Sequence, residues 1–337
     1  MAVHIAGPGV RHDPVQQALT GAAVNALSAP SVFNTQPWRW HIAGDTAELW
    51  ADRSRQLTTV DPDGRLLLIS CGAALHHFRT AFAARGRRAA VERRPDPARP
   101  DLLAVLRGGD ITEPDPSDVR LLRAMSIRRA DRRPFADRPV PLAAFNRVRA
   151  VDVPGVHVHT VRPEQVVTLT VAAGHAAARE LSDEAYREEL RAWRERGENG
   201  VGDGVPASSA GPRAGRPVPV RDFAAAAPDA QTLHDAVSDG DRFARYLIVW
   251  TDSDGPAAWL AAGEALSEVL LQAASEGLAA SPMSDLVEVP ASHALVRELL
   301  GGIGYPAIAV RVGVPAREGR VGSTLRRSPT AAITVES

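Results

Sequence analysis

Lysine is absent from this chain of 337 residues, so all 39 basic side chains are arginine. This absence excludes every mechanism that needs a lysine amine: Schiff-base aldolases, pyridoxal-phosphate enzymes, Walker-A nucleotide binding and ordinary protein kinases. Cysteine occurs once, at Cys71. A disulfide within the chain, an iron–sulfur cluster and a multi-cysteine zinc site are therefore excluded as well.

An excess of charge of one sign is also missing. The 39 basic and 40 acidic side chains give a formal net charge of -1. This balance removes the electrostatic argument for nucleic acid or an anionic membrane as a partner. The first residues lack the basic segment and apolar core of a signal peptide, and we see no apolar run near the roughly 18 to 20 residues that cross a bilayer. These absences predict a cytoplasmic protein.

The chain contains a repeated pattern. Residues 71–86 and 262–277 align at an offset of 191, which places Gly72 over Gly263. In both segments apolar residues recur every three or four positions and a glycine follows, which predicts two long buried helices with left-handed C-terminal caps. A weaker similarity aligns 17–30 with 141–154 at an offset of 124. We interpret the pattern as a tandem duplication, and chance similarity between alanine-rich helices is the alternative.

The two offsets differ by 67 residues, so the second copy is expected to carry an insertion of about that size. Residues 163–195 have the pattern of one long helix, and 197–220 form a stretch rich in glycine and proline. A loop of this length is typical of a functional lid or of a disordered segment. We therefore predict one half over 1–118 and a second over 119–337, with a lid insertion near 197–223.

Short segments of strand character separate the helices. Residues 39–44 and 47–52 predict a hairpin across Gly44 and Asp45, and further strands are expected at 156–161, 246–251 and 306–313. Such strands mixed with long helices predict an α+β or mixed α/β fold, in which helices flank central sheets.

Arginines are concentrated in two places, the segment 128–133 and a pair near the C-terminus. A guanidinium group can hold a phosphate through two parallel hydrogen bonds, and it stays charged. Without lysine, such clusters and backbone N–H groups are what remains to hold a phosphorylated cofactor. A solvated basic surface is the alternative. The arginines concerned are Arg128, Arg129, Arg132, Arg133, Arg326 and Arg327.

The turn at 29–40 carries several neutral hydrogen-bonding side chains, among them Ser31, Asn34 and Gln36. It has no carboxylate, so it suits a polar but uncharged ligand edge, such as a ribityl chain or a heterocyclic imide. A plain connecting loop is the alternative interpretation.

Four segments together resemble one known family. PSVFNTQPW at 30–38 resembles the PSxxNxQPW signature of the nitroreductase-like flavoproteins, and RRADRRPF at 128–135 resembles the arginine-rich segment that opens their fold. GLAASPMSD at 277–285 and LRRSP at 325–329 are similar to further family segments. Two copies with a lid-like insertion resemble the dormancy-associated Acg branch of actinobacteria. The resemblance spans about residues 16 to 330.

This resemblance implies an α+β, nitroreductase-like fold, duplicated in tandem within one chain, and FMN as the cofactor. Ordinary members are homodimers that build each FMN site from both chains. Here the asparagine-bearing loop belongs to the first half and the arginine segment to the second, so one complete set of site residues exists. We therefore expect a monomeric pseudo-dimer that holds one FMN, with a degenerate second site.

The resemblance also assigns residues to the FMN site. Arginines would contact the phosphate and ribityl groups, loop side chains would approach from the other half, and backbone N–H groups would face flavin N5. Ala130 departs from the family, since many relatives have serine or threonine there. Neither a catalytic side chain nor a metal site is expected. The predicted cofactor-binding residues are Ser31, Asn34, Gln36, Arg128, Arg129, Arg132, Arg133, Ala280, Ser281, Thr324, Arg326 and Arg327.

Histidines are weaker candidates. His157 and His159 share one face of a predicted strand, but no third metal ligand stands beside them at a convincing spacing. The pair His76 and His77 lies on a predicted buried helix, where a core hydrogen bond is the preferred interpretation.

The implied function is an FMN-dependent NAD(P)H oxidoreductase that acts by ping-pong hydride transfer through flavin N5 to a small-molecule electron acceptor. A lid that stays closed over the ring would instead give an FMN-binding or FMN-sequestering protein with little or no reductase activity. A tailoring oxidoreductase of small-molecule biosynthesis is a third interpretation.

Overall fold

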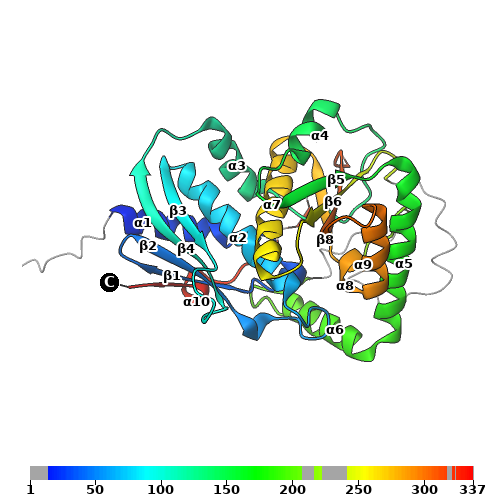
Figure 1. Ribbon diagram of the computed structural model, residues 1–337, viewed down its shortest axis with the longest axis horizontal. Coiled ribbons are helices and arrows are strands. Elements are labelled where there is room, and N and C mark those ends of the chain that lie inside the picture. The colour runs from blue at the N-terminus through cyan, green and yellow to red at the C-terminus, as the bar shows by residue number, and fades with distance from the viewer. Residues whose placement is uncertain (1–13, 207–215, 222–240, 317–320, 323, 337) are drawn as a thin grey trace, which may run out of the picture.

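Two β-sheets lie on either side of two long central helices, and α5, α8 and α9 cover the far side of the second sheet (Figure 1). The computed structural model describes residues 14–206, 216–221, 241–316, 321–322 and 324–336. In that part of the chain one sheet has the strand order β3-β4-β2-β1-β9 and the other has the order β5-β6-β8-β7. The predicted α+β class is confirmed.

The first half contains the hairpin that the sequence predicts. β1 and β2 are antiparallel, and Ala43 lies opposite Thr46 across the turn. Gly44 has φ of 53°, a left-handed conformation that a tight hairpin turn needs. The elements of this half are α1 (Pro14–Ala26), β1 (Trp38–Ala43), β2 (Thr46–Ala51), α2 (Arg65–Ala83), β3 (Arg87–Arg93) and β4 (Leu102–Ile111). Helix α3 (Pro116–Ile127) spans the predicted boundary at residue 118.

The second half contains the other sheet and ends inside the first. Its last strand, β9, pairs in parallel with β1 and places Ile333 beside Trp40. The end of the chain therefore completes the sheet of the first half. The elements are α4 (Leu142–Arg149), β5 (Val156–Thr160), α5 (Val166–Ser182), α6 (Glu184–Glu198), β6 (Arg245–Thr251), α7 (Pro256–Ser275), β7 (Ala279–Met283), α8 (Asp285–Glu288), α9 (Pro290–Leu299), β8 (Tyr305–Gly313), α10 (Pro329–Ala332) and β9 (Ile333–Val335).

Helices α2 and α7, predicted from the repeat, cross in the middle of the molecule (Figure 1). α2 is 19 residues long and apolar enough to pass for a membrane span by length and composition alone. Most of α2 is buried against α1, α3 and α7. This burial accounts for its composition, because core helices of globular proteins pass the same test.

The single helix predicted over 163–195 is wrong, because the chain breaks at Asp183. This residue has an extended conformation, with φ of -103° and ψ of 111°. Its carboxylate accepts a hydrogen bond from the backbone N–H of Tyr186, so it caps α6 while α5 ends. Of the predicted lid at 197–223, residues 207–215 and 222–223 lie outside the described residues.

Candidate functional site

A cavity lies where the two halves meet, and it encloses about 1100 Å³ when the solvent at its open mouth is counted. Loop 30–34 and three residues of α2 form one side, and the arginine segment forms another. Leu266 of α7, the end of β7 and the two residues after it contribute further wall, and Val205, Val220 and Arg221 of the predicted lid segment 197–223 complete it. A concave site that combines apolar side chains with convergent polar groups is the usual form of a cofactor site.

Loop 30–36 has an unusual backbone. Phe33, Asn34 and Gln36 have φ of 47°, 55° and 49°, the left-handed region that non-glycine residues rarely adopt. Two hydroxyl groups hold the loop: Ser31 Oγ accepts from the Gln36 N–H at 3.0 Å, and Ser70 Oγ of α2 accepts from the Val32 N–H at 3.1 Å. Strained backbone of this kind concentrates at functional sites, and the sequence offered no sign of it.

Asn34 connects three segments that are far apart in the sequence. Its Nδ2 donates to the carbonyl oxygens of Gly204 at 3.0 Å and Leu325 at 3.1 Å, and its Oδ1 accepts from Arg326 Nη1 at 3.0 Å. Gln36 is fully buried, and its Nε2 donates to the Gly202 carbonyl at 2.8 Å. The predicted loop amides therefore also anchor the insertion, and Gln36 lies outside the cavity lining.

Arg128 and Arg326 bring positive charge into one end of the cavity. Both contact the Ser28 carbonyl, at 3.4 Å and 3.3 Å, and each has a buried Nε with no hydrogen-bond partner within the described residues. Burial, together with the nearby Arg326 and Arg129, lowers the pKa of Arg128 to about 9. Burial and Arg129 lower the pKa of Arg326 to about 10. These guanidinium groups repel one another, so an anion between them would be strongly stabilised.

The other end of the cavity has mixed charge. Arg132 and Arg221 line it together with Asp285. Burial and the charge of Arg221 lower the pKa of Arg132 to about 10, and Asp285 opposes that shift. Burial raises the pKa of Asp285, and Arg221 opposes it. This end therefore contains an acceptor as well as donors.

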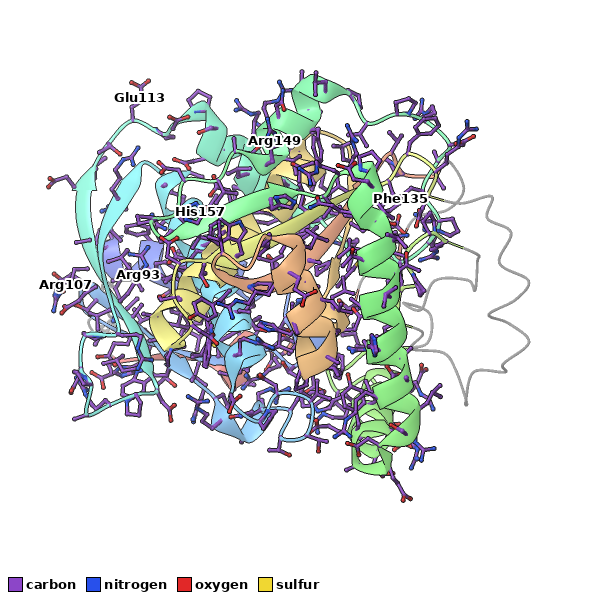
Figure 2. The ribbon with its side chains drawn as sticks, turned by 45° about the vertical axis from the view of Figure 1, so that its right-hand side comes forward. Arg93, Arg107, Glu113, Phe135, Arg149 and His157 are labelled. Carbon is purple, nitrogen blue, oxygen red and sulfur yellow. The ribbon has the colours of Figure 1, made fainter. Side chains whose placement is uncertain are left out.

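Arg311 positions the arginine segment, and sequence reasoning missed it. Its side chain is fully buried, and its Nη2 donates to the carbonyl oxygens of Asp131 at 2.8 Å and Arg133 at 3.0 Å. It also lies over the ring of Phe135, labelled in Figure 2, at 4.0 Å, and forms an ion pair with Asp241. No local pattern distinguishes Arg311 from the other arginines in the sequence.

Arg133 and Arg327 do not line the cavity. Arg133 forms a two-pronged pair with Asp131, at 2.9 Å and 2.8 Å. Arg327 Nη1 donates to the carbonyl oxygens of Gln36 at 3.0 Å and Trp38 at 3.1 Å. Both guanidinium groups are therefore engaged in holding the surrounding loops.

Ala280 and Ser281 also lie outside the lining. They belong to β7 and stand opposite Val312 and Arg311 of β8, and the Ala280 carbonyl accepts from the Asp131 N–H at 3.0 Å. The residues that follow, 282–285, line the cavity instead. The structure thus brings seven predicted residues together at the cavity: Ser31, Asn34, Arg128, Arg129, Arg132, Thr324 and Arg326.

Arg221 and Asp285 line the cavity but are absent from the predicted set. Asp285 belongs to the segment GLAASPMSD, in which the family resemblance assigned Ala280 and Ser281 to the site. Arg221 directly follows the glycine- and proline-rich stretch 197–220, and no sequence motif distinguishes it there.

The histidines serve packing. His76 and His77 are each hydrogen-bonded through Nδ1 to Ser267 Oγ at 2.8 Å, which confirms the predicted core hydrogen bond. His157, on β5 in Figure 2, stacks on Trp250 and pairs with Asp252 at 2.8 Å. In the described ranges no group of three or more potential metal ligands occurs.

Known proteins resemble this chain over most of its length, although no protein-family model matches it. "Putative NAD(P)H nitroreductase Rv3131" of Mycobacterium tuberculosis is 38% identical over 309 residues, covering 90% of this chain and 86% of the relative. "Putative NAD(P)H nitroreductase acg" of the same organism is 35% identical over 309 residues, covering 90% and 91%. The chain belongs to this family of Acg-type nitroreductase homologues, as the resemblance predicted.

Solved structures with detectable similarity include the FMN and NADPH-dependent nitroreductase NfnB from sphigopyxis sp. strain HMH. It is 18% identical and matches 64% of this chain and 99% of that chain with a TM-score of 0.43. A nitroreductase with bound FMN from Bacteroides fragilis is 15% identical and matches 62% and 95% with a TM-score of 0.34. The family assignment rests on the sequence relatives.

Proposed function

We propose that the chain is a monomeric pseudo-dimer that binds one FMN in the cavity between its halves and acts as an NAD(P)H-dependent oxidoreductase. The observation that carries the proposal is the meeting of Asn34 from the first half with Arg128 and Arg326 from the second at one cavity. The names of the sequence relatives support the activity, and the FMN named for the solved nitroreductases supports the cofactor.

The residues present fit a phosphorylated flavin. Guanidinium donors are offered by three lining residues, Arg128, Arg129 and Arg326. The buried Nε atoms of Arg128 and Arg326 have no hydrogen-bond partner among the described residues. A phosphate dianion would offset the burial and the charge repulsion that lower the pKa values of Arg128 and Arg326. The middle of the cavity is apolar, which suits a flat aromatic ring; its side chains include Phe33, Leu66, Ile69, Leu266 and Ile308.

Bound FMN would supply the redox chemistry, accepting a hydride from NAD(P)H at N5 and passing it to a small-molecule acceptor in a ping-pong sequence. The chain's own residues bind and orient. Thr324 Oγ1 accepts from Arg326 Nη1 at 2.6 Å and Asn34 Oδ1 accepts from it at 3.0 Å, so both hold this guanidinium at the phosphate end. Arg132 brings positive charge to the other end, where it stabilises negative charge that develops on the ligand.

A second candidate function is FMN sequestration, and the position of the insertion favours it. Residues Gly202 and Gly204 are hydrogen-bonded to loop 34–36, while Val205, Val220 and Arg221 form part of the cavity wall. An insertion held in place in this way would exclude nicotinamide from the ring and suppress turnover.

The test is anaerobic reduction of the purified yellow protein with NADH or NADPH, followed by the visible absorbance of the flavin. Rapid bleaching of a protein with one FMN per chain supports the reductase. Bleaching only in Asp203→Ala supports sequestration, since Asp203 holds the insertion through Arg55 and through Arg196 at 2.9 Å and 2.7 Å. Asp252→Ala, which removes an exposed ion pair with His157, is the control. A colourless protein that does not bind added FMN contradicts both functions.

A further inference from the structure

Asp285 is the one acidic side chain among the cavity-lining residues that the structure describes. It lies at the first turn of α8 and is 8% exposed. The backbone N–H groups of Asp285 and Leu286 favour the charged form of this carboxyl group. A carboxylate has about four acceptor positions, so it keeps capacity for a ligand beside these two groups.

The charged side chains of the cavity lining form two groups of different character, one around Arg128 and Arg326 and one around Arg132 and Asp285. Burial lowers the pKa values of Arg128 and Arg326, and the charge of Arg129 adds to both shifts; no described acidic group opposes them. The charges acting on Arg132 and on Asp285 are of both signs. Arg221, Arg311 and Asp285 act on Arg132, whereas Arg221 and Glu288 act on Asp285. A dianion is therefore favoured beside Arg128 and Arg326, and a neutral group with both donors and acceptors is favoured beside Arg132 and Asp285.

The oxidised isoalloxazine ring has carbonyl and ring-nitrogen acceptors but a single N–H donor, at N3. A carboxylate at the ring end has no other ring donor to pair with, whereas guanidinium groups such as Arg132 pair with the acceptors. Resting on the FMN site proposed above, we propose that Asp285 accepts the hydrogen bond of the flavin N3–H and thereby sets the orientation of the ring relative to the phosphate.

The test measures dissociation constants for FMN and for 3-methyl-FMN, which lacks this N–H, by quenching of flavin fluorescence. The wild-type chain is expected to prefer FMN by about 10-fold or more, the usual effect of one hydrogen bond to a charged group. Asp285→Ala is expected to lose about that factor for FMN and to bind both flavins within about threefold of each other.

Glu288→Gln is the matched control. Glu288 is on the same short helix and carries the same charge, but it pairs with Arg221 and Tyr186 and does not line the cavity. This variant is expected to keep the wild-type preference for FMN. If its preference collapses as that of Asp285→Ala does, local charge and not a hydrogen bond is responsible, and the inference is overturned.

If Asp285→Ala fails to fold, dissociation constants for FMN measured over a pH series with Asp285→Asn and the wild type test the same inference. Burial raises the pKa of Asp285, so its carboxylate becomes protonated at a higher pH than that of an exposed aspartate. As the pH falls, the affinity of the wild-type chain for FMN should therefore fall more steeply than that of Asp285→Asn. Parallel curves, or an unchanged preference in Asp285→Ala, overturn the inference and leave the FMN site standing. A wild-type chain that binds neither flavin refutes the proposed function itself.

Discussion

Gly72 of α2 and Gly263 of α7 lie against each other where the two central helices cross. A Cβ atom added at Gly72 would stand 2.9 Å from the Cα of Gly263 and 2.0 Å from the carbonyl oxygen of Leu260. A Cβ added at Gly263 would stand 2.0 Å from the carbonyl oxygen of Ile69. Ile69 and Leu260 are themselves 191 positions apart, so the contact is reciprocal under the offset of the repeat.

Reciprocal contacts are the property of a two-fold symmetric dimer interface, in which residue i of one copy contacts residue j of the other and the reverse. The crossing therefore supports the proposal that an ancestral dimer was fused into one chain. The terminal strand β9, which leaves the second half to join β1, supports it further.

Substitution of either crossing glycine should destabilise the protein. Gly72→Ala places a methyl group into a backbone carbonyl that cannot move without separating α2 from α7, so we expect a loss of roughly 1–3 kcal/mol in the free energy of unfolding. Urea denaturation measures it. Gly174→Ala on α5 is the control, because nothing lies within 4 Å of its added Cβ. Equal stability of the two variants would contradict the close crossing.

Removing the charge of Glu264 should also weaken the contact between the halves. This carboxylate is fully buried in α7 and pairs with Arg79 of α2 and with Arg93, labelled in Figure 2, each at 2.6 Å. Glu264→Gln leaves two arginines without their partner. Both are more than a third exposed, so solvent screens part of the cost, and we expect a loss of about 1–3 kcal/mol.

The matched control for Glu264→Gln is Glu276→Gln. Glu276 forms a two-pronged pair with Arg147 at 2.6 Å, but on the surface. Its loss should change the midpoint of urea denaturation little, because exposed ion pairs contribute little to stability. A larger effect at Glu276 than at Glu264 would show that burial does not decide the strength of these pairs.

Acid should destabilise the fold through His76. Burial lowers the pKa of this imidazole from 6.5 to about 4, so between those values the unfolded chain binds more protons than the folded one. The contribution of the neutral His76 imidazole to the free energy of unfolding is complete above pH 6.5 and is lost as the pH falls toward 4. One such group accounts for about 2 kcal/mol between pH 7.5 and pH 5.

Denaturation curves at pH 7.5 and pH 5 measure the effect of His76. His76→Gln should be less stable than the wild type at pH 7.5 and should lose less stability on acidification. The neighbouring His77, whose pKa burial also lowers, keeps part of the pH dependence in that variant. An unchanged pH dependence would mean that His76 is not the group responsible.

Arginines that line the cavity should respond differently to substitution from arginines that do not. Arg128→Ala and Arg326→Ala each remove a guanidinium from the cavity lining, and each is expected to weaken FMN binding by about 10- to 100-fold. Arg133→Ala, which removes a side chain paired with Asp131, should bind FMN close to the wild-type affinity. Flavin fluorescence titration separates these outcomes, and a larger loss for Arg133→Ala would place the phosphate elsewhere.

Local patterns in the sequence predicted much of the fold. The spacing of apolar residues identified α2 and α7, and the alternation around Gly44 identified the β1–β2 hairpin, because both depend on neighbours within a few positions. The break between α5 and α6 was missed, since a single capping side chain, Asp183, decides it against a continuous helical pattern.

The candidate site, like the fold, could be predicted from the sequence only in part. The sequence by itself determined which residue types are available: arginine and no lysine, an asparagine-bearing turn, and an arginine segment in the other half. Only the tertiary structure decided which guanidinium groups face the cavity. Asp131 engages Arg133, and the carbonyl oxygens of Gln36 and Trp38 engage Arg327, whereas Arg128 and Arg326 are buried beside each other without a carboxylate. Neighbouring arginines look alike in a sequence, because their roles depend on partners brought close by packing across the fold.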